Sequence, residues 1–517
     1  MKKTTFALIA LLSLSLTTIS GAEKSPRVEK NLSIFNDVLR QVDMWYVDTL
    51  NYEALTETAL TAMLKQIDPY TVYIPERKNE TVKMFTTGKY GGIGAIIMQY
   101  DSAKVVISQP YKDLPAQRNG ILAGDVILEV DGKKCKGLKT SDVSSMLRGK
   151  AGSTVKIKLQ REGVEKPFVK EIVREEIKLP TVPHYAMLND TVGYMAFSEF
   201  TEHSSKDFRH ALDDLCQQQG CRHLVLDLRG NGGGLISEAL NIAGYFLPKG
   251  TVVVTTKGKV ESSKRTYKTV SDPLYPTLPI TILVDRHSAS ASEILCGSLQ
   301  DLHRATLIGE KTFGKGLVQN IRKVVHDGNL KVTTAKYYLP SERCIQGIGI
   351  EPDIAVKDDT TKVNITYSLY RQHLCFDYAN HYHRLHDSIP ALNTRLDNLE
   401  DKGFFGLDSL DLADFEQFLQ ERNFTYETET SRYFADLLRF AHQEDLDSAM
   451  VADLEALQEK LTSDYHAALW KHKAEVLSEL ESEIASRYYY QIAPTIIALR
   501  RDPVLARALK EIAGTNK

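Results

Sequence analysis

The chain has 517 residues, of which 43% are hydrophobic and 25% charged, and its formal net charge at pH 7 is −3. These proportions are ordinary for a globular protein, and they exclude a disordered chain, a collagen-like fibre and a multi-span membrane protein. A charge this near zero argues against a dedicated nucleic-acid binder, which would carry a basic domain. The length predicts roughly three domains.

Residues 1–22 have the pattern of a signal peptide. Two lysines open the segment, an apolar stretch runs from Phe6 to Leu16, and Ser20-Gly21-Ala22 fits a small-x-small cleavage site. The apolar stretch is shorter than the about 20 residues that span a bilayer. We therefore expect an exported protein, which would associate with a membrane only if this segment is retained.

The next two regions differ in their predicted secondary structure. Residues 23–87 are predicted to be helical, because apolar residues recur at helix spacing in 28–46 and 52–67. Residues 88–175 carry short strand patterns separated by Gly-containing turns, which indicates a small β-rich module. We expect its strands at 95–99, 104–109, 126–130 and 154–160, and a short helix at 141–147.

Residues 176–358 alternate strand and helix patterns, which predicts an α/β core. Strands are expected at 191–197, 224–228, 252–255, 280–284 and 305–308, helices at 206–218, 235–246 and 291–302, and a hairpin around Asp327-Gly328. Residues 359–517 lack strand patterns and are expected to be helical. A rhythm of three and four residues predicts one helix face from Leu454, Leu457, Leu461, Tyr465, Ala468 and Leu469.

Two further sets of residues, cysteines and histidines, are candidates for disulfides or a metal site. Six cysteines permit disulfides in an exported protein, and Cys216 and Cys221 are the nearest pair, but the spacings fit no established framework. Four histidines gather near position 380, and their spacings do not place three of them on one helix face: His373, His381, His383 and His386. We expect a solvated helix there and no metal.

The segment Ser288-Ala289-Ser290-Ala291-Ser292-Glu293 lies between a predicted strand and a predicted helix. A serine at such a turn can expose its hydroxyl beside the N–H groups of the first helical turn, which would hold an oxyanion. Lys315 follows 25 residues after Ser290, between two glycines. The segment also fits a capping box, with Ser290 and Glu293 as its partners. The two interpretations are compatible.

A second motif is the run Asp227-Leu228-Arg229-Gly230-Asn231-Gly232-Gly233-Gly234. It precedes a predicted helix, so it could be a tight turn or an anion-binding loop. It lacks the Lys-Ser/Thr ending and the G-x-G-x-x-G spacing of nucleotide-binding loops. We therefore do not expect a nucleotide there.

Together these motifs resemble peptidase family S41, the C-terminal processing or tail-specific serine proteases. The resemblance spans roughly residues 30–358 and includes Gly309–Gly316 and Gly347–Asp353. It implies a fold class of an α/β protease core of the ClpP/crotonase type, with an inserted β-rich PDZ domain and helical N- and C-terminal regions. It also implies a serine endopeptidase that needs no metal or organic cofactor.

Carried over by position, Ser290 is implied as the nucleophile and Lys315 as the general base. Gln319, one helical turn's spacing beyond Lys315, resembles the residue that orients the lysine in part of the family. The oxyanion hole would come from the N–H groups of Ala291 and of Gly234 or Gly233. Supporting positions are implied for Glu293, Asp301 and Thr312.

The chemistry agrees with this assignment. A lysine accepts a proton only when it is neutral, and burial near Phe313 would lower its pKa from the free value of about 10.4. Rival nucleophiles are the two neighbouring serines, Ser288 and Ser292. A rival base would be His287 or His303, of which the first is close in sequence but would tend to point away.

The module at 88–175 resembles a PDZ domain. Its carboxylate-binding loop would be Tyr90, Gly91, Gly92, Ile93, Gly94 and Ala95, whose N–H groups would hold a terminal carboxylate while the peptide adds as a strand. The alternative is a Gly-rich turn that binds nothing. Asn119 stands where relatives often carry a small apolar residue, which leaves the ligand preference open.

The resulting prediction is an exported, periplasmic endopeptidase that acts on proteins or peptides with accessible C-termini. The family implies a gating role for the PDZ domain, and a homodimer or adaptor contact through the C-terminal helices. No nucleic-acid partner is expected. The alternatives are a catalytically inactive, PDZ-bearing scaffold and a hydrolase of small esters or peptides.

Overall fold

The computed structural model describes residues 26–78, 84, 86–357, 365–386, 388–389, 406–426, 428–461 and 465–515. The chain divides into two compact units, residues 1–73 and 74–517. The predicted signal segment lies outside the described residues. Among the residues described, no helix has both the length and the apolar character needed to cross a bilayer.

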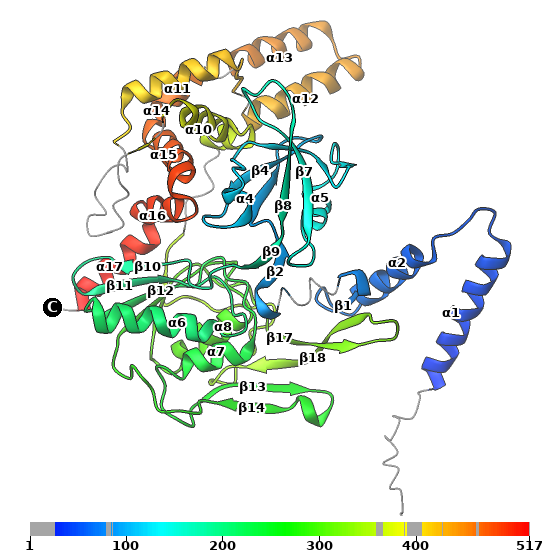
Figure 1. The fold of residues 1–517 in the computed structure, drawn as a ribbon, viewed down its shortest axis with the longest axis vertical. Coiled ribbons are helices and arrows are strands. Elements are labelled where there is room, and N and C mark those ends of the chain that lie inside the picture. Colours follow the sequence, from blue (N-terminus) through cyan, green and yellow to red (C-terminus); the bar gives the residue numbers. More distant parts are fainter. Residues whose placement is uncertain are drawn as a thin grey trace, which may run out of the picture. The chain divides into compact units, whose positions relative to one another are not determined.

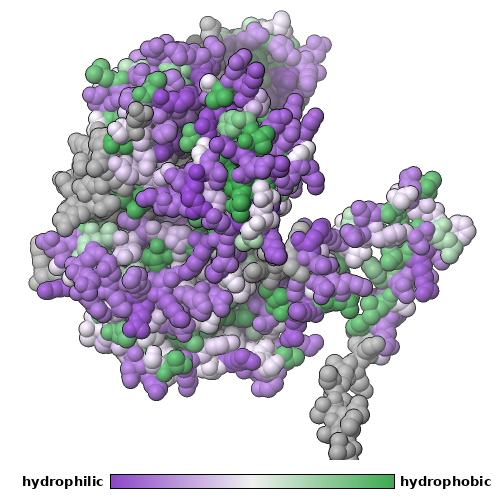
Figure 2. Space-filling view, in the orientation of Figure 1, coloured by the Kyte–Doolittle hydropathy of each residue, from purple (hydrophilic) through white to green (hydrophobic). Residues whose placement is uncertain are grey.

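The N-terminal unit consists mainly of two helices, as the apolar periodicity predicts: α1 (Pro26–Trp45) and α2 (Tyr52–Lys65). Helix α2 begins at Asn51, whose side chain accepts a hydrogen bond from the N–H of Ala54 at 3.1 Å. Helix α1 buries none of its side chains, and apolar residues such as Phe35 are exposed on it. Figure 2 shows these apolar side chains on the surface of the helical pair.

The β-rich module is a sheet with two short helices. Its strand order is β3-β4-β5-β7-β8, so β3 is an edge strand. The alternation of Val155, Ile157 and Leu159 toward the core explains β7, because alternate strand residues face one side. The elements are β3 (Ala95–Gln99), β4 (Val105–Pro110), α4 (Pro115–Arg118), β5 (Val126–Val130), β6 (Lys133–Lys134), α5 (Thr140–Leu147), β7 (Thr154–Gln160) and β8 (Phe168–Val173).

Two strands that the sequence did not predict frame this module. They are β2 (Lys89–Gly92) and β9 (Glu175–Lys178), which pair antiparallel with Tyr90 opposite Ile177. They bring the two ends of the module together, as an insertion requires.

The α/β core contains a sheet of order β10-β11-β12-β15-β16-β19. The pairs from β11 to β19 are parallel and β10 is antiparallel. Helices α6, α7 and α8 cover one face, and α16 and α17 pack on the other (Figure 1). The elements are β10 (His184–Met187), β11 (Val192–Ala196), α6 (Ser204–Asp213), a π-helical turn η2 (Asp214–Gln218), β12 (His223–Asp227), α7 (Ile236–Ala243), β15 (Ile280–Val284), α8 (Ala291–Asp301), β16 (Thr306–Gly309) and β19 (Ile354–Ala355).

A second, antiparallel sheet flanks the core. The predicted hairpin around Asp327-Gly328 consists of β17 (Leu317–Lys323) and β18 (Asn329–Tyr338). Strand β18 also pairs with β13 (Val252–Gly258), and β13 pairs in turn with β14 (Arg265–Lys268). The sequence predicted a shorter β13 and no β14. This sheet places the residues after Lys315 on a strand.

The described residues beyond 364 form helices, as predicted. They are α9 (Ile365–Arg371), α10 (Leu374–Leu385), α11 (Ser409–Glu421), α12 (Glu429–Gln443), α13 (Ser448–Leu461), α14 (Tyr465–Lys471), α15 (Lys473–Tyr489), α16 (Ile492–Arg500) and α17 (Pro503–Thr515). The prediction of one helix face from Leu454 to Leu469 is wrong, because these residues belong to two helices, α13 and α14. Of these two helices, α14 contributes Leu469 to a buried cluster.

Candidate active site

The candidate nucleophile stands at a strained turn between β15 and α8. Ser290 has a φ of 59°, a left-handed conformation that is uncommon for a residue with a side chain. Such strain persists only where the surroundings enforce it, and it gathers at functional sites. Ser290 is half-buried, whereas the residues that follow it in α8 are buried.

The two rival serines are occupied elsewhere. Ser288 and Ser292 are fully buried. The Ser288 hydroxyl donates to the carbonyl of Leu228 at 2.8 Å, and the Ser292 hydroxyl donates to the carbonyl of Asn231 at 2.9 Å. Both hydroxyls therefore hold the serine segment against the glycine run, which leaves Ser290 as the accessible serine of the three.

A buried carboxylate joins the two halves of the site. Glu293 is fully buried, and its Oε2 accepts the backbone N–H of Ser290 at 2.8 Å and that of Lys315 at 2.9 Å. Its Oε1 accepts the hydroxyl of Thr312 at 2.6 Å and the N–H of Gly314 at 2.8 Å. Four donors offset the cost of burying this charge. One side chain thus fixes the serine turn and the lysine segment to each other.

The surroundings of Lys315 lower the pKa of its side chain. Burial lowers the pKa of its ammonium, and the nearby positive charge of Lys331 lowers it further, while Glu293 acts in the opposite direction. The result is a pKa below the ordinary value, which increases the neutral, proton-accepting fraction.

Tyr337 is a site residue that the sequence analysis did not identify. It is buried on β18, and its hydroxyl lies 3.1 Å from the carbonyl oxygen of Ser290 and also hydrogen-bonds the carbonyl of Lys315. It therefore links the same two backbones that Glu293 links. No motif marks it, since a buried tyrosine in a strand is ordinary, and only the pairing of β17 with β18 brings it to the site.

The glycine run lies directly against the serine turn. A Cβ placed on Gly233 would stand 2.8 Å from the Cβ of Ser290, so only glycine fits there. The N–H of Gly233 donates to Asn231 Oδ1 at 2.9 Å. Across the described chain, no hydrogen bond occupies the N–H of Gly234 or of Ala291. Of the two alternatives, Gly234 therefore has the N–H available for an oxyanion.

Two predicted positions have other contacts. Gln319 lies on β17, so its spacing from Lys315 is not a helical turn, and its amide nitrogen donates to the carbonyl of Leu317 and to Thr333 Oγ1, at 3.2 and 3.4 Å. Asp301 lies at the far end of α8, where it pairs with Arg343 at 2.7 Å. The hairpin predicted around Asp327-Gly328 explains the first difference, because Gln319 lies on its first strand, β17, and not on a helix.

The candidate histidines do not converge. His287 is exposed and its Nε2 accepts from Arg286 at 3.3 Å. The four histidines near position 380 pack on different aromatic rings, namely His373 on Tyr100, His381 on Phe418, His383 on Tyr488 and His386 on Tyr382. Within the described ranges, no group of three metal-ligating side chains gathers. Cys216 and Cys221, like the other four cysteines, are free, and the Cys221 thiol donates to the carbonyl of His223 at 3.2 Å.

The Gly-rich loop of the β module has the geometry of an anion cradle. Gly94 has a φ of 70°, and a Cβ there would meet Leu114 at 2.6 Å. The carbonyls of Ile93 and Gly94 accept from Ala116 and Tyr111, but no described residue accepts from the N–H of either. Beside them β3 has a free edge, to which an extended peptide can add.

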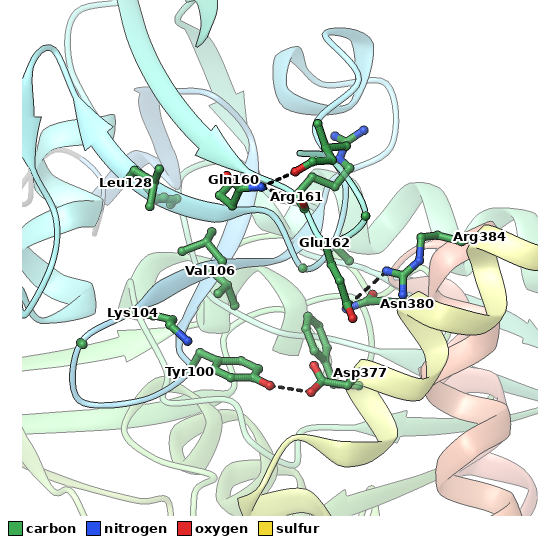
Figure 3. A pocket seen from close by; sticks show the side chains of 18 of the residues that line it. Tyr100, Lys104, Val106, Leu128, Gln160, Arg161, Glu162, Asp377, Asn380 and Arg384 are labelled. Atoms are coloured by element: carbon green, nitrogen blue, oxygen red, sulfur yellow. Dashed lines mark hydrogen bonds and ion pairs between the residues drawn. The ribbon is translucent and has the colours of Figure 1, made fainter. Parts of the chain in front are cut away.

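A cavity of about 780 Å³ lies away from the candidate active site, between the β module and helices α10 and α11 (Figure 3). Tyr100 donates to Asp377 at 2.5 Å across it, and Glu162 pairs with Arg422 at 2.8 Å and with Arg384 at 3.3 Å. Neither Ser290 nor Lys315 lines this cavity. It is a space between two domains and not the candidate active site.

Comparisons with known proteins agree with this arrangement. Family models match residues 191–356 (peptidase family S41), 106–161 (PDZ domain) and 365–512 (probable PDZ-protease, C-terminal helical domain). A carboxy-terminal-processing protease of Bartonella bacilliformis is 38% identical over 332 residues, which cover 63% of this chain and 75% of that protein.

Two solved structures are similar to parts of this chain. The photosystem II D1 C-terminal processing protease is 28% identical, with a TM-score of 0.38, covering 65% of this chain and 95% of that one. The PDZ domain of a Vibrio cholerae carboxy-terminal protease, solved with a peptide, is 30% identical, with a TM-score of 0.17, covering 18% of this chain and 99% of that one. From its motifs, its fold and its relatives, this chain belongs to peptidase family S41, among the carboxy-terminal-processing proteases, with a PDZ domain and a C-terminal helical domain.

Proposed function

We propose that the protein is an exported, periplasmic serine endopeptidase that receives protein C-termini in its PDZ domain and cleaves polypeptides with Ser290 and Lys315. The observation that carries the proposal is that the backbone N–H groups of both residues donate to the same oxygen of Glu293. This shared partner fixes the nucleophile and the base to one buried group.

The chemistry follows from that pair. Neutral Lys315 takes the proton of the Ser290 hydroxyl while the oxygen attacks the scissile carbonyl carbon. The N–H groups of Gly234 and Ala291 hold the oxyanion. The lysine then gives its proton to the leaving amine as the peptide bond breaks, which leaves an acyl-enzyme. Lys315 next deprotonates a water that hydrolyses the ester and restores Ser290.

The PDZ domain would select the substrate. The N–H groups of Ile93 and Gly94 would bind the terminal carboxylate, and the chain upstream of it would pair with the free edge of β3. An amidated C-terminus lacks the carboxylate, so it removes this interaction while the rest of the substrate stays the same.

The test compares the wild type with Ser290→Ala and Lys315→Ala on a protein that has an unstructured tail, with products identified by mass spectrometry. Lys311→Ala is the matched control, because Lys311 lies in the same segment but is exposed and pairs with Glu351. We expect cleavage to disappear in the first two variants and to persist in the control. Cleavage that survives Lys315→Ala would reject the lysine as base, and a folded but inert wild type would favour the scaffold alternative.

The pH dependence gives a second test. Because the base must be neutral, the cleavage rate should rise with pH through the lowered pKa of Lys315 and level off below 10.5. If the cleavage rate of a protein that retains Lys315 instead rises around the ordinary pKa of histidine, a histidine is the base. Amidation of the substrate tail should weaken cleavage of the same protein if the PDZ assignment holds.

A homodimer or adaptor contact through the C-terminal helices stays a prediction. Exposed apolar side chains on α12 and α13, among them Leu437, Phe440 and Met450, are compatible with such a contact. Sedimentation of the full chain at micromolar concentration would detect a dimer, and a monomer there would exclude a stable one.

A further inference from the structure

The C-terminal helical domain reaches the glycine run of the active site through one side chain. Asp502 lies in the short link between α16 and α17, and its Oδ2 accepts from Arg229 Nη2 at 2.5 Å. Arg229 belongs to the run 227–234 that supplies Gly234. The two partners are 273 residues apart in the chain.

Arg229 is held from two sides. Its Nε and Nη2 also donate to Asp227, at 2.9 and 2.6 Å, and the hydroxyl of Tyr194 donates to the same carboxylate at 2.8 Å. The side chains of Asp227 and Asp502 are each only 9% exposed. We call Tyr194, Asp227, Arg229 and Asp502 the clamp. A guanidinium between two such carboxylates makes charge-assisted hydrogen bonds in a poorly solvated place.

The position of Asp502 is itself fixed. Its Oδ1 accepts the N–H groups of Val504 and Leu505, at 2.9 and 3.1 Å, so it caps the start of α17. Apolar residues of α16 and α17 pack on the sheet around Val225 and Leu283. One oxygen of the Asp502 carboxylate therefore accepts hydrogen bonds from α17, and the other accepts from Arg229.

The clamp holds Arg229 near the start of the glycine run 227–234, and the other end of that run lies against Ser290. After Arg229, the N–H of Gly230 donates to Asp285 at 3.0 Å, and the carbonyl of Asn231 accepts the N–H of Ala289 at 3.0 Å. Three successive anchors, at Arg229, Gly230 and Asn231, thus set the path of the chain toward Gly234. If the first anchor is lost, the run gains freedom where the oxyanion donor has to be placed.

We propose that Asp502 is a positioning residue for catalysis: through Arg229 it holds the glycine run so that the N–H of Gly234 meets the oxyanion. The inference deepens the proposed function and rests on it. It makes the last helices of the C-terminal domain part of the peptidase site.

The variant Asp502→Asn separates this role from a structural one. Asparagine caps helices about as well as aspartate, so α17 keeps its start, but the charge facing Arg229 is lost. We expect kcat to fall by about tenfold to a hundredfold, less than the 10²–10³ that loss of an oxyanion donor costs, while KM and the melting temperature stay near the wild-type values. Glu511→Gln on α17 is the control, because that carboxylate pairs with Arg507 on the surface, and its kcat should not change.

A second readout does not depend on activity. In the full-length Ser290→Ala protein, adding Asp502→Asn should speed hydrogen exchange of amides in 228–235 while those in 503–515 stay protected. Wild-type kcat together with unchanged exchange in 228–235 would overturn the proposal. Faster exchange in 503–515 with a lower melting temperature would also overturn it, since the residue would then only stabilise the helix. Loss of all cleavage in the wild type would contradict the proposed function, while the exchange result would still decide on the clamp.

Discussion

The C-terminal helical domain packs against its two neighbours in opposite ways. Against the peptidase core, α16 and α17 bury a continuous apolar cluster in which Ile496 and Leu505 are fully buried. Against the PDZ domain, α10 and α15 make polar contacts through side chains such as Gln109, Tyr100 and Glu162, around a cavity of about 780 Å³.

This difference indicates which parts move together. An apolar seam of this kind resembles a domain interior, so it resists separation, whereas polar contacts between domains exchange readily with water. The C-terminal helices are therefore a fixed extension of the peptidase core. The polar contacts to the PDZ domain are expected to break at lower cost than the apolar seam.

The largest effect should come from the apolar seam. Leu505→Ala removes a fully buried side chain between α17 and the sheet. We expect a loss of about 2–5 kcal/mol in the stability of the core, because the transfer free energy is lost and a cavity remains. Thermal unfolding followed by circular dichroism measures it. Leu410→Ala, at a side chain that is 78% exposed, is the control, and an equal loss in both variants would contradict the seam.

A smaller effect is expected at the buried part of the PDZ contact. Gln109 is buried, and its amide donates to the carbonyl of Ser486 at 3.0 Å and accepts from Gln491 at 3.1 Å. Gln109→Leu removes both hydrogen bonds, while the Ser486 carbonyl still accepts from Tyr490 and the Gln491 amide still donates to Pro110. At about 0.5–1.5 kcal/mol for each lost bond, the cost should be about 1–3 kcal/mol. Hydrogen exchange should become faster in 486–491 and remain slow in α17. Equal loosening of both segments would mean that the two contacts are not independent.

The Tyr100 contact should respond to pH. Tyr100→Phe removes the hydrogen bond to Asp377 and should cost about 1 kcal/mol. Burial raises the pKa of Asp377, and the bond from Tyr100 opposes that rise. A carboxyl with a raised pKa contributes stability fully below 3.8 and loses that contribution as pH rises through its folded pKa. The variant should move this loss to higher pH in melts recorded from pH 3.8 upward, and an unmoved profile would contradict the assignment.

The smallest effect is expected at the rim of the cavity. Glu162 pairs with Arg384 and Arg422, and all three side chains are at least one-third exposed. Glu162→Gln should therefore cost no more than about 1 kcal/mol, and the cost should vanish in high salt. Melting curves at two salt concentrations measure it. A cost above that of Gln109→Leu would reverse the proposed ranking of the PDZ contacts.

The sequence predicted the site where local pattern and chemistry coincide. Ser290 and Glu293 stand at a helix start that the capping box indicates, and the structure places that start at Ala291. The glycines at 233 and 234 mark close approaches, because a Cβ would stand 2.8 Å from the Cβ of Ser290 at the first and 2.3 Å from the carbonyl oxygen of Phe200 at the second. Which serine would be accessible followed only from the structure, since Ser288 and Ser292 are distinguished by burial and not by sequence.

Other parts depended on the register of paired strands and on what those strands pack against. Gln319 was expected a helical turn from Lys315, but its strand pairs with β18, and a register shift between Val318 and Gln319 further changes its direction. Tyr337 enters the site through the same pairing. The sequence predicts this hairpin, but the register shift and the contacts of Tyr337 with Ser290 and Lys315 depend on packing that no local window contains.

By itself, the sequence determined the kind of protein: an S41 peptidase core with a PDZ module, and the elements that carry Ser290 and Lys315. The kind of protein follows from the resemblance of its motifs to known members of the family, and the elements follow from short-range signals, namely apolar periodicity and turn residues. Only the tertiary structure decided that Glu293 and Tyr337 join the two segments and that Asp502 contacts Arg229. The physical reason is that charge pairs and buried hydrogen bonds form between groups that packing brings together, whatever their separation along the chain.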